Sequence, residues 1–325
     1  MTGRDYVFRL IAATGLAMAL GGAALAQETG NTVANAAVAT PAPASTPAPE
    51  PVRLTLDQID LAHHSVSGRL TTDTNPRFLA LADPSAIPLL ARARSGDLLD
   101  ASVDAAGNPT RLVGVVRVMR PVAVWPRVLA LAGVLGALLL AASLASGWRP
   151  QRFLIGVDNR YSNSQCQLAL WFSAVAVAYG ATVALRVVNL GGDFIGGVGL
   201  TANVAALSGF SALSFGGAKA ITAGKVAAAT ARGLEVKTPS ITPPSLVRDL
   251  VSNDHNVPDL GDFQMILISA VAVAIFLAQT FQYLGALEIS PNVTLPDVDT
   301  TLLASFGIGQ AAYLAKKGAS NAGDG

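Results

Sequence analysis

Long uncharged stretches of apolar residues dominate the second half of the chain. Residues 128–146 contain no acidic or basic side chain, and as a helix they would cross a hydrocarbon core of roughly 30 Å. Trp125 and Trp148 flank this stretch, as aromatic residues do at the two surfaces of a bilayer. The pattern predicts a transmembrane helix over residues 125–148.

A second pattern, in which apolar and polar residues alternate, covers residues 52–122. Val52–Leu56, Val66–Leu70 and Leu112–Val118 all have a period of two, which is typical of strands buried on one face. We expect a β-rich domain of about 70 residues here, either a small barrel or a sandwich.

The residues before this domain have the pattern of a targeting segment followed by a tether. A basic start and an apolar run precede the small-residue pattern Ala24–Ala26, so residues 1–26 are predicted to be a signal peptide. Residues 27–51 are rich in Ala and Pro, the composition of an extended linker. An uncleaved N-terminal helix is the alternative, and in both cases the β domain is exported.

The remaining half contains a duplicated pattern. Gln167–Leu185 and Gln264–Phe281 are both apolar, and both include the string Ser-Ala-Val-Ala-Val-Ala. A second apolar segment follows each of them, and three positions of the first match three of the second at one offset: Gly209 with Gly307, Phe215 with Tyr313, and Lys219 with Lys317. Such duplications are typical of membrane proteins.

This duplication predicts two helical hairpins, over residues 156–222 and 258–317. A cytoplasmic loop over residues 223–257 joins them, and a cytoplasmic tail covers residues 318–325. The second helix of each hairpin is the weaker prediction. The segment 196–218 is rich in Gly and Ser, and the segment 302–315 is short for a membrane span, so either helix could be re-entrant or interfacial. The Gly-rich run over residues 191–199 lacks the Lys-Ser/Thr continuation of a phosphate loop and is predicted to be a flexible turn.

Charge gives the orientation. Every lysine lies in the segments that we assign to the cytoplasm, together with several arginines: Arg149, Arg152, Arg160, Lys219, Lys225, Arg232, Lys237, Arg248, Lys316 and Lys317. The positive-inside rule then places the β domain in the periplasm. The predicted fold class is an α-helical membrane protein of the bacterial inner membrane, with about five transmembrane helices, a duplicated helical hairpin and a small all-β periplasmic domain.

The hairpins carry two short motifs. The first is Arg-x-Ser-x-Ser-x-x-Gln-x-x-x-Trp, from Arg160 to Trp171; the second runs from Gly307 to Lys317 with Tyr313 inside it. In these motifs the chain resembles uncharacterised bacterial inner-membrane proteins, although Gly309 stands where their second motif has Ser. The resemblance covers roughly residues 156–317 and implies architecture but no activity.

Asp158–Gln165 is the most unusual polar run and stands where the first hairpin begins. It is either a capped helix start at the headgroup level, with Ser164 or Asn163 as the cap, or part of a binding surface. We select ten residues as candidates for contact with headgroups or a protein partner: Asp158, Arg160, Ser162, Ser164, Gln167, Trp171, Gln264, Tyr313, Lys219 and Lys317.

Several function classes find no support. A net charge of +1 gives no basic field for nucleic acid, and no catalytic motif or metal-ligand spacing stands out. The single cysteine, Cys166, lies in an apolar stretch and has no predicted role. We therefore expect no cofactor, no metal ion and no enzymatic activity, with an enzyme acting on lipid or periplasmic substrates as a distant third possibility.

The leading hypothesis is an interaction or scaffold protein that presents its β domain in the periplasm, with membrane lipids and a protein partner or a second copy as contacts. The alternative is a channel or small-solute permease built from the repeated hairpins. No charged residue occupies the centre of a predicted helix, which argues against proton-coupled transport.

Overall fold

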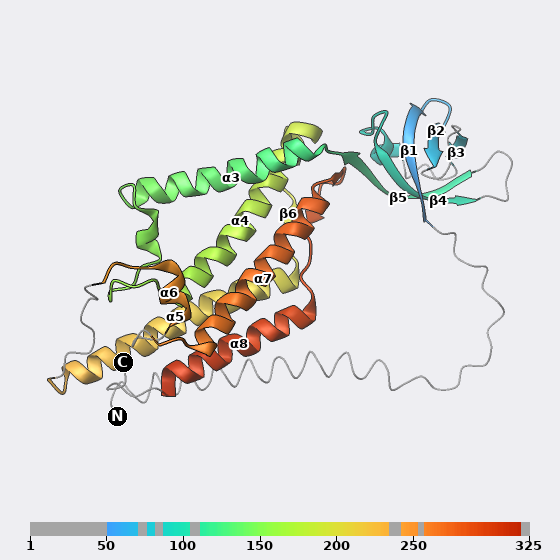
Figure 1. The fold of residues 1–325 in the computed structure, drawn as a ribbon. Coiled ribbons are helices and arrows are strands. Elements are labelled where there is room, and N and C mark those ends of the chain that lie inside the picture. The colour runs from blue at the N-terminus through green and yellow to red at the C-terminus, as the bar shows by residue number, and fades with distance from the viewer. Residues whose placement is uncertain are drawn as a thin grey trace, which may run out of the picture. The chain divides into compact units, whose positions relative to one another are not determined.

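A computed structural model describes residues 51–70, 77–81, 87–104, 111–233, 242–252 and 257–319. The predicted signal peptide lies outside these residues, as do the linker up to residue 50 and the tail from residue 320. Figure 1 shows a β domain followed by a group of long helices.

Five strands form the β domain: β1 (Pro51–Asp60), β2 (Ser65–Leu70), β3 (Arg77–Leu81), β4 (Leu98–Asp104) and β5 (Arg111–Pro121). Their order is β3-β2-β1-β4-β5, and a parallel pairing of β3 with β5 closes the sheet. The β-rich prediction is confirmed, and the domain is a barrel. The short helix α2 (Ile87–Leu90) lies between β3 and β4. Strand order, closure and helix position are those of the five-stranded Greek-key barrel called the OB-fold, a fold that hosts many unrelated functions.

Alternation along the strands fills the barrel. The inward positions are leucine and valine side chains that are at most 1% exposed: Leu54, Leu56, Val66, Leu79, Leu99 and Leu112. The polar residues between them point outward, because successive side chains of a strand alternate between its two faces. This burial explains why the alternation in the sequence is so regular.

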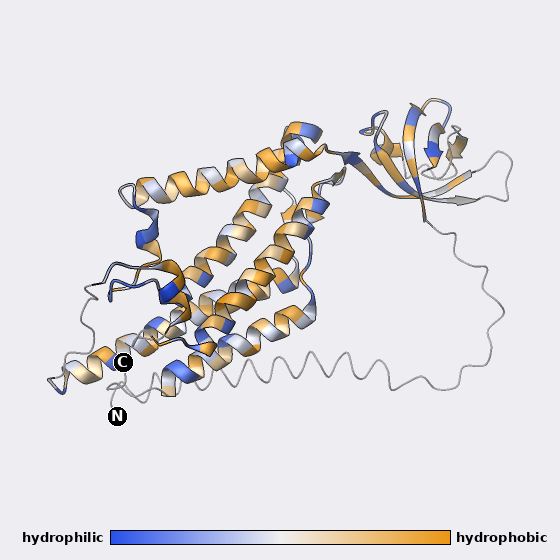
Figure 2. Ribbon diagram, viewed as in Figure 1, coloured by the Kyte–Doolittle hydropathy of each residue, from blue (hydrophilic) through white to orange (hydrophobic). Residues whose placement is uncertain are grey.

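Four helices are long and apolar enough to cross a membrane: α3 (Val124–Ala145), α4 (Asn163–Leu190), α5 (Ala202–Thr230) and α7 (Leu260–Tyr283). Figure 2 shows their apolar residues along the whole of each helix. The remaining long helix, α8 (Thr300–Ala319), is formed as predicted but is not among these four. Length and composition therefore support four of the roughly five predicted spans.

Two helix ends differ from the prediction. α3 ends at Ala145, and Trp148 lies beyond it with a φ of 63°. α5 continues to Thr230, past residue 222, where the sequence places the end of the first hairpin. Alanine-rich residues extend this helix because alanine has the highest helix propensity. The predicted cytoplasmic loop therefore begins later than expected, and it contains the short helix α6 (Leu246–Val251).

Small residues let the helices pack closely. α4 contacts α3, α5 and α7, and α8 contacts α5 and α7. Ala178, Ala181 and Ala272 have no exposed surface, and an added Cβ on Gly180 would lie 2.9 Å from Val134 in α3. Close approach at small residues is the usual way in which helices associate in lipid.

The loops that follow α4 and α7 are tied together. The short helix η3 (Gly192–Phe194) precedes β6 (Val198–Gly199), which pairs in parallel with β8 (Val293–Thr294). Gly197 has a φ of 73°, and an added Cβ there would lie 1.9 Å from the carbonyl oxygen of Pro291. The glycine run thus permits close backbone approach, and it adopts defined elements where the sequence predicts a flexible turn.

The two hairpins have the same order of elements: α4, β6, α5 and α7, β8, α8. Between α7 and β8, the second hairpin also contains β7 (Ala286–Glu288), which pairs antiparallel with the end of β5. The last strand of the barrel is therefore joined to the helical region by backbone hydrogen bonds as well as by the chain that leads into α3.

Candidate functional site

The polar run before α4 forms a tight turn. The backbone N–H of Gly156 donates to the carbonyl oxygen of Arg160 (2.8 Å), and Asn159 has a φ of 59°. The carboxylate of Asp158 lies over Gly156, where an added Cβ atom would be 2.6 Å from Oδ1. The short helix η2 (Pro150–Phe153) connects this turn to α3.

Arg160 faces an acidic residue from a distant part of the chain. Its Nε lies 3.7 Å from Oδ1 of Asp249 in α6, and the two side chains are 11% and 0% exposed. Oδ2 of Asp249 accepts hydrogen bonds from the backbone N–H groups of Tyr161 (3.2 Å) and Ser245 (3.0 Å). Where the sequence predicts a contact with lipid or a partner, most of Arg160 is already enclosed by the protein.

The serines of the first motif lie at the start of α4. Ser162 occupies the N-cap position without a side-chain capping bond, and its Oγ lies 3.3 Å from Oγ of Ser164. The sequence favours Asn163 or Ser164 as the cap, but both are inside the helix and buried. Ser164 is therefore not available to a headgroup.

Trp171 is a packing residue of the helical core. It is 1% exposed, its ring centroid lies 5.5 Å from that of Phe276, and its Nε1–H donates to Oγ of Ser208 in α5 (2.8 Å). This hydrogen bond satisfies the indole N–H, as burial requires. The contact fixes the position of α4 against α5.

Gln167 differs from Trp171, because neither polar atom of its side chain has a partner. It is 1% exposed, and its Nε2 and Oε1 make no hydrogen bond with any described residue. The same holds for Oγ of Ser211 in α5 and Oε1 of Gln310 in α8, which belong to residues 1% and 4% exposed. We call Gln167, Ser211 and Gln310 the unpaired set.

Helix register places the unpaired set at one level. Gln167 lies one turn before Trp171 and Ser211 about one turn after Ser208, and the two helices run in opposite directions. On the other side of α5, Gly307 of α8 lies against Phe210 and Leu314 lies against Gly217. Gln310 is halfway between these contacts, beside the turn of α5 that holds Ser211.

The candidates of the second hairpin are dispersed. Gln264 is exposed, one turn inside α7. Asp259 caps this helix by accepting from the N–H groups of Gly261 (2.9 Å) and Asp262 (3.2 Å), and it pairs with Lys316 of α8. The hydrogen bond from Lys316 lowers the pKa of the Asp259 carboxyl below its usual value. The ionic contact at this helix start is therefore made by Lys316, which lies one residue before the predicted candidate Lys317.

The matched lysines make matching contacts. Nζ of Lys219 lies 5.7 Å above the ring of Phe215, and Nζ of Lys317 lies 5.6 Å above the ring of Tyr313. Each is a cation–π contact between residues four apart in a helix. The structure gives these two pairs the same local geometry, and the duplication stays a prediction.

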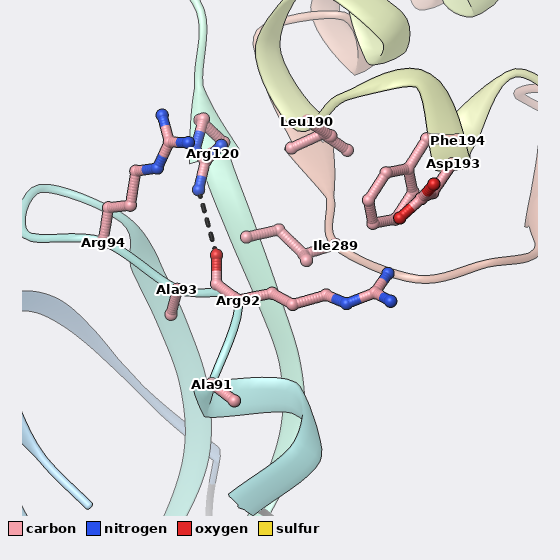
Figure 3. Close-up of a pocket in the computed structure, with 9 residues that line it drawn as sticks. All are labelled: Ala91, Arg92, Ala93, Arg94, Arg120, Leu190, Asp193, Phe194 and Ile289. Atoms are coloured by element: carbon pink, nitrogen blue, oxygen red, sulfur yellow. Dashed lines mark hydrogen bonds between the residues drawn. The ribbon is translucent and has the colours of Figure 1, made fainter.

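A cleft of about 320 Å³ lies at the other end of α4, beside the barrel (Figure 3). Arginines and small or apolar residues line it, and they come from the loop after α2, from β5, from the end of α4 with η3, and from the segment after β7: Ala91, Arg92, Ala93, Arg94, Arg120, Leu190, Asp193, Phe194 and Ile289. The sequence gives no indication of this cleft.

Arg120 holds one wall of the cleft. Its Nε and Nη2 donate to the two carboxylate oxygens of Asp97 (3.0 and 2.9 Å), and the side chains are 12% and 4% exposed. Its Nη1 donates to the carbonyl oxygen of Asn189 at the end of α4 (2.6 Å), and Nη2 also reaches that of Arg92 (3.2 Å). One guanidinium thus links the barrel to α4.

Arg186, near the end of α4, is 1% exposed. Its guanidinium donates to the carbonyl oxygens of Ser290 (2.7 Å) and Pro291 (3.2 Å), with longer contacts to those of Glu288 (3.4 Å) and Phe194 (3.5 Å). The guanidinium also lies 5.4 Å from the ring centroid of Phe194. Arg186 therefore joins the loop after α4 to the loop after α7.

Comparisons with protein-family models, with curated proteins and with solved structures found no match for this chain.

Sequence reasoning misses Asp97, Asp249 and the partners of Arg120 and Arg186. Asp97 and Arg120 are 23 residues apart in the chain, and Arg186 donates to carbonyl groups up to 105 residues away. One signal was available: Arg186 is the one charged residue within residues 163–190, and such a residue needs a buried partner.

Proposed function

We propose that this chain is a protein of the bacterial inner membrane that presents its β barrel in the periplasm as an interaction or scaffold domain, with its C-terminus in the cytoplasm. The observation that carries this proposal is the double attachment of the barrel. Besides the chain connection into α3, β5 pairs with β7 through Met119, Arg120 and Pro121, and Arg120 reaches α4. A barrel attached in this way is held at the membrane surface instead of hanging from a single linker.

Charge supports the sidedness. The ends of the helices that lie away from the barrel carry Arg160 before α4 and Lys316 and Lys317 at the end of α8. The arginines at the barrel end, Arg127 and Arg186, donate to carbonyl oxygens of the protein. Four apolar helices alone would return the chain to the side on which it began. The proposed topology therefore needs α8 as a fifth span, and lysines at its far end fit a cytoplasmic terminus.

Cysteine accessibility tests this topology in a Cys166→Ser background. Cysteines at Ala62 in the barrel and at Ile195 in the loop after α4 should react with an impermeant reagent added from outside. Cysteines at Ser240 and Ser320 should react only after permeabilisation. Labelling of Ser320→Cys from outside would contradict the fifth span.

Exposed apolar residues on the barrel offer a surface for a partner. Phe78 on β3 and Val116 on β5 are 70% and 60% exposed. Their two strands pair with each other only at one end. Contiguous apolar patches often mark protein contacts, and Phe78 and Val116 are two positions at which such a contact can be sought. The proposal predicts that these positions lie against another protein in native membranes.

Site-specific photocrosslinking tests the scaffold function directly. A photoreactive amino acid is placed at Phe78 or Val116, and a control is placed at Leu140 on α3, which is 51% exposed and would face lipid. The proposal predicts that both barrel positions capture the same protein, or a second copy of this chain, and that Leu140 does not. Capture of no protein from either barrel position would contradict it.

A channel or small-solute permease is the second candidate, and the unpaired set is the observation that favours it. A buried polar atom without a partner costs about 1–3 kcal/mol, so three such residues on three helices need a compensating role. Contact with water or a polar solute passing between α4, α5 and α8 would provide one. Vesicles that contain the full chain should then swell in osmotic gradients of small uncharged solutes, and Gln310→Leu should slow the swelling; vesicles as impermeable as empty ones would exclude the permease.

A further inference from the structure

We propose that the cleft between the barrel and the end of α4 binds the phosphate group of an anionic phospholipid headgroup. This inference goes beyond the scaffold function and does not depend on it, because it requires only that α4 spans the membrane. Geometry, charge and position in the bilayer each support it.

The first support is the charge of the lining. Of the three arginines in the cleft, only Arg120 has an ion-pair partner among the described residues, namely Asp97. Arg92 and Arg94 are both exposed. Asp193 is the one acidic residue in the lining, and it too is exposed. The cleft therefore has a surplus of positive charge, and guanidinium groups bind phosphate oxygens through paired hydrogen bonds.

The second support is the position of these guanidinium groups. Figure 3 shows Arg94 extending beside Arg120, while Arg92 extends below Ile289 toward the loop that holds Phe194. The guanidinium carbon of Arg92 lies 5.2 Å from the ring centroid of Phe194, on which Arg186 also lies. This stacking holds Arg92 at the cleft while its N–H groups stay available for an anion.

The third support is the apolar floor. Leu190, Phe194 and Ile289 line the cleft above Arg92 and to the side of Arg120 in the view of Figure 3, and Phe194 and Ile289 are also part of the buried core. A soluble anion would need only the charges. A phospholipid also brings glycerol and the start of its acyl chains, which would lie on such a floor.

The fourth support is the level of the cleft in the membrane. Leu190 is the last residue of a helix long enough to span a bilayer. Trp125 in the first turn of α3 is 73% exposed. Three residues earlier, the N–H of Val122 donates to the carbonyl oxygen of Gly285, which follows α7. An exposed tryptophan beside three helix ends is typical of the headgroup region, so the cleft opens where lipid phosphates are found.

The experiment compares lipids that differ only in headgroup. The full chain is purified in a neutral detergent, and native mass spectrometry measures the retention of phosphatidylglycerol and phosphatidylcholine with the same acyl chains. The test variant is Arg92→Gln with Arg94→Gln. The matched control is Arg69→Gln, which changes the charge of an exposed arginine elsewhere on the barrel, where it pairs with Asp57.

We expect the native chain to retain phosphatidylglycerol in preference to phosphatidylcholine. One arginine near a membrane surface contributes about five-fold to the binding of anionic lipid. The double variant should therefore bind phosphatidylglycerol about 25-fold more weakly, while the Arg69 control keeps the native affinity. All three chains should melt within a few degrees of one another without lipid, because Arg92 and Arg94 are exposed.

Two results would overturn the inference. The first is equal retention of phosphatidylglycerol by the native chain and the double variant. The second is that inorganic phosphate or glycerol 3-phosphate raises the melting temperature as much as the lipid does, which would assign the cleft to a soluble phosphate. Neither result bears on the photocrosslinking test of the barrel, so failure here and failure of the scaffold function are distinguishable.

Discussion

Two levels of the helical region bury polar side chains, and the guanidinium groups at the barrel end are paired more completely than the unpaired set. At the end near the barrel, the guanidinium groups of Arg120 and Arg186 reach a carboxylate and several carbonyl oxygens. At the level of the unpaired set, Gln167, Ser211 and Gln310 have polar atoms without partners among the described residues. At the barrel end, polar groups connect different segments of the chain. In the unpaired set, polar atoms make no such connection among the described residues.

This difference assigns different roles to the two regions. A buried group whose partners all come from the protein contributes to stability, and its removal leaves those partners unpaired. A buried group without partners lowers stability unless water or a ligand pairs with it. Substitutions of the paired arginines and substitutions in the unpaired set should therefore have opposite effects on the free energy of unfolding.

The largest effect is expected at Arg186. Arg186→Met keeps the apolar stem but removes the donors to Ser290 and Pro291. We expect a loss of about 3–5 kcal/mol in the free energy of unfolding, because each buried carbonyl oxygen left without its donor costs about 1–3 kcal/mol; denaturant unfolding in detergent micelles measures it. Arg186→Lys keeps the charge and loses the planar fork of donors. Its free energy of unfolding should therefore fall between those of the native chain and the Met variant. Equal stability of the Met variant and the native chain would contradict the distinction between the paired arginines and the unpaired set.

The next effect is expected at Arg120 and Asp97. Arg120→Ala removes the bidentate ion pair with Asp97 and the bond to Asn189, and hydrogen bonds to charged groups contribute about 1.5–3 kcal/mol each. Hydrogen exchange should show faster exchange of the amides that join β5 to β7. A double-mutant cycle with Asp97→Asn measures the coupling between the two side chains; additive losses would mean that the pair does not hold the barrel.

A smaller effect, which depends on pH, is expected at Asp100 in the barrel. It tests whether a polar group whose partners come from the protein also contributes to stability outside the helical region. Arg53 donates to both of its carboxylate oxygens (2.7 and 3.0 Å) and Arg117 to one (2.9 Å), and these contacts lower the pKa of Asp100. Stability from a lowered carboxyl pKa is present above the unfolded value, about 3.9, and is lost as pH falls through the folded value.

Asp100→Asn should therefore cost about 1–2 kcal/mol at pH 7, and the cost should shrink at pH values below about 4. Thermal unfolding of the barrel in the full chain, followed by circular dichroism at both pH values, measures the difference. Lys225→Gln, which changes charge far from the barrel, is the control. A cost that stays constant between pH 7 and pH 3 would contradict the role of the ion pair.

The smallest effect is expected at the unpaired set. Gln310→Leu replaces a side chain whose amide oxygen is unpaired by an apolar side chain of similar volume, so stability should stay the same or rise by about 1 kcal/mol. Ser208→Ala is the matched control, because it removes the paired acceptor of Trp171 on the neighbouring helix and should cost about 1 kcal/mol. A larger loss for Gln310→Leu than for Ser208→Ala would show that the amide is paired in the folded protein.

The sequence predicts the elements well and their long-range partners poorly. Alternation in Val66–Leu70 and Leu112–Val118 marks strands because one barrel face is buried, and the apolar runs of α3, α4 and α7 mark helices because lipid surrounds them. The prediction ends the first hairpin at residue 222, whereas alanine residues continue α5 to Thr230 because alanine has the highest helix propensity.

The candidate residues are predicted less well, for a physical reason. Arg160 is selected as a contact for headgroups or a partner because it belongs to the polar run Asp158–Gln165, whereas folding brings Asp249 of α6 beside it. The cleft depends on four segments that meet only in the folded chain. Pairings of single charged residues across long separations leave no periodic signal in one sequence.

The distance between the barrel and the helices tests the central claim most directly. Spin labels are placed at Gln58 on β1 and Leu200 before α5, both exposed, in a Cys166→Ser background reconstituted into lipid nanodiscs. Pulsed electron paramagnetic resonance should give a single narrow distance distribution for the native junction and a broad one for Arg120→Ala. A broad distribution in the protein with Arg120 intact would contradict a barrel held at the membrane surface.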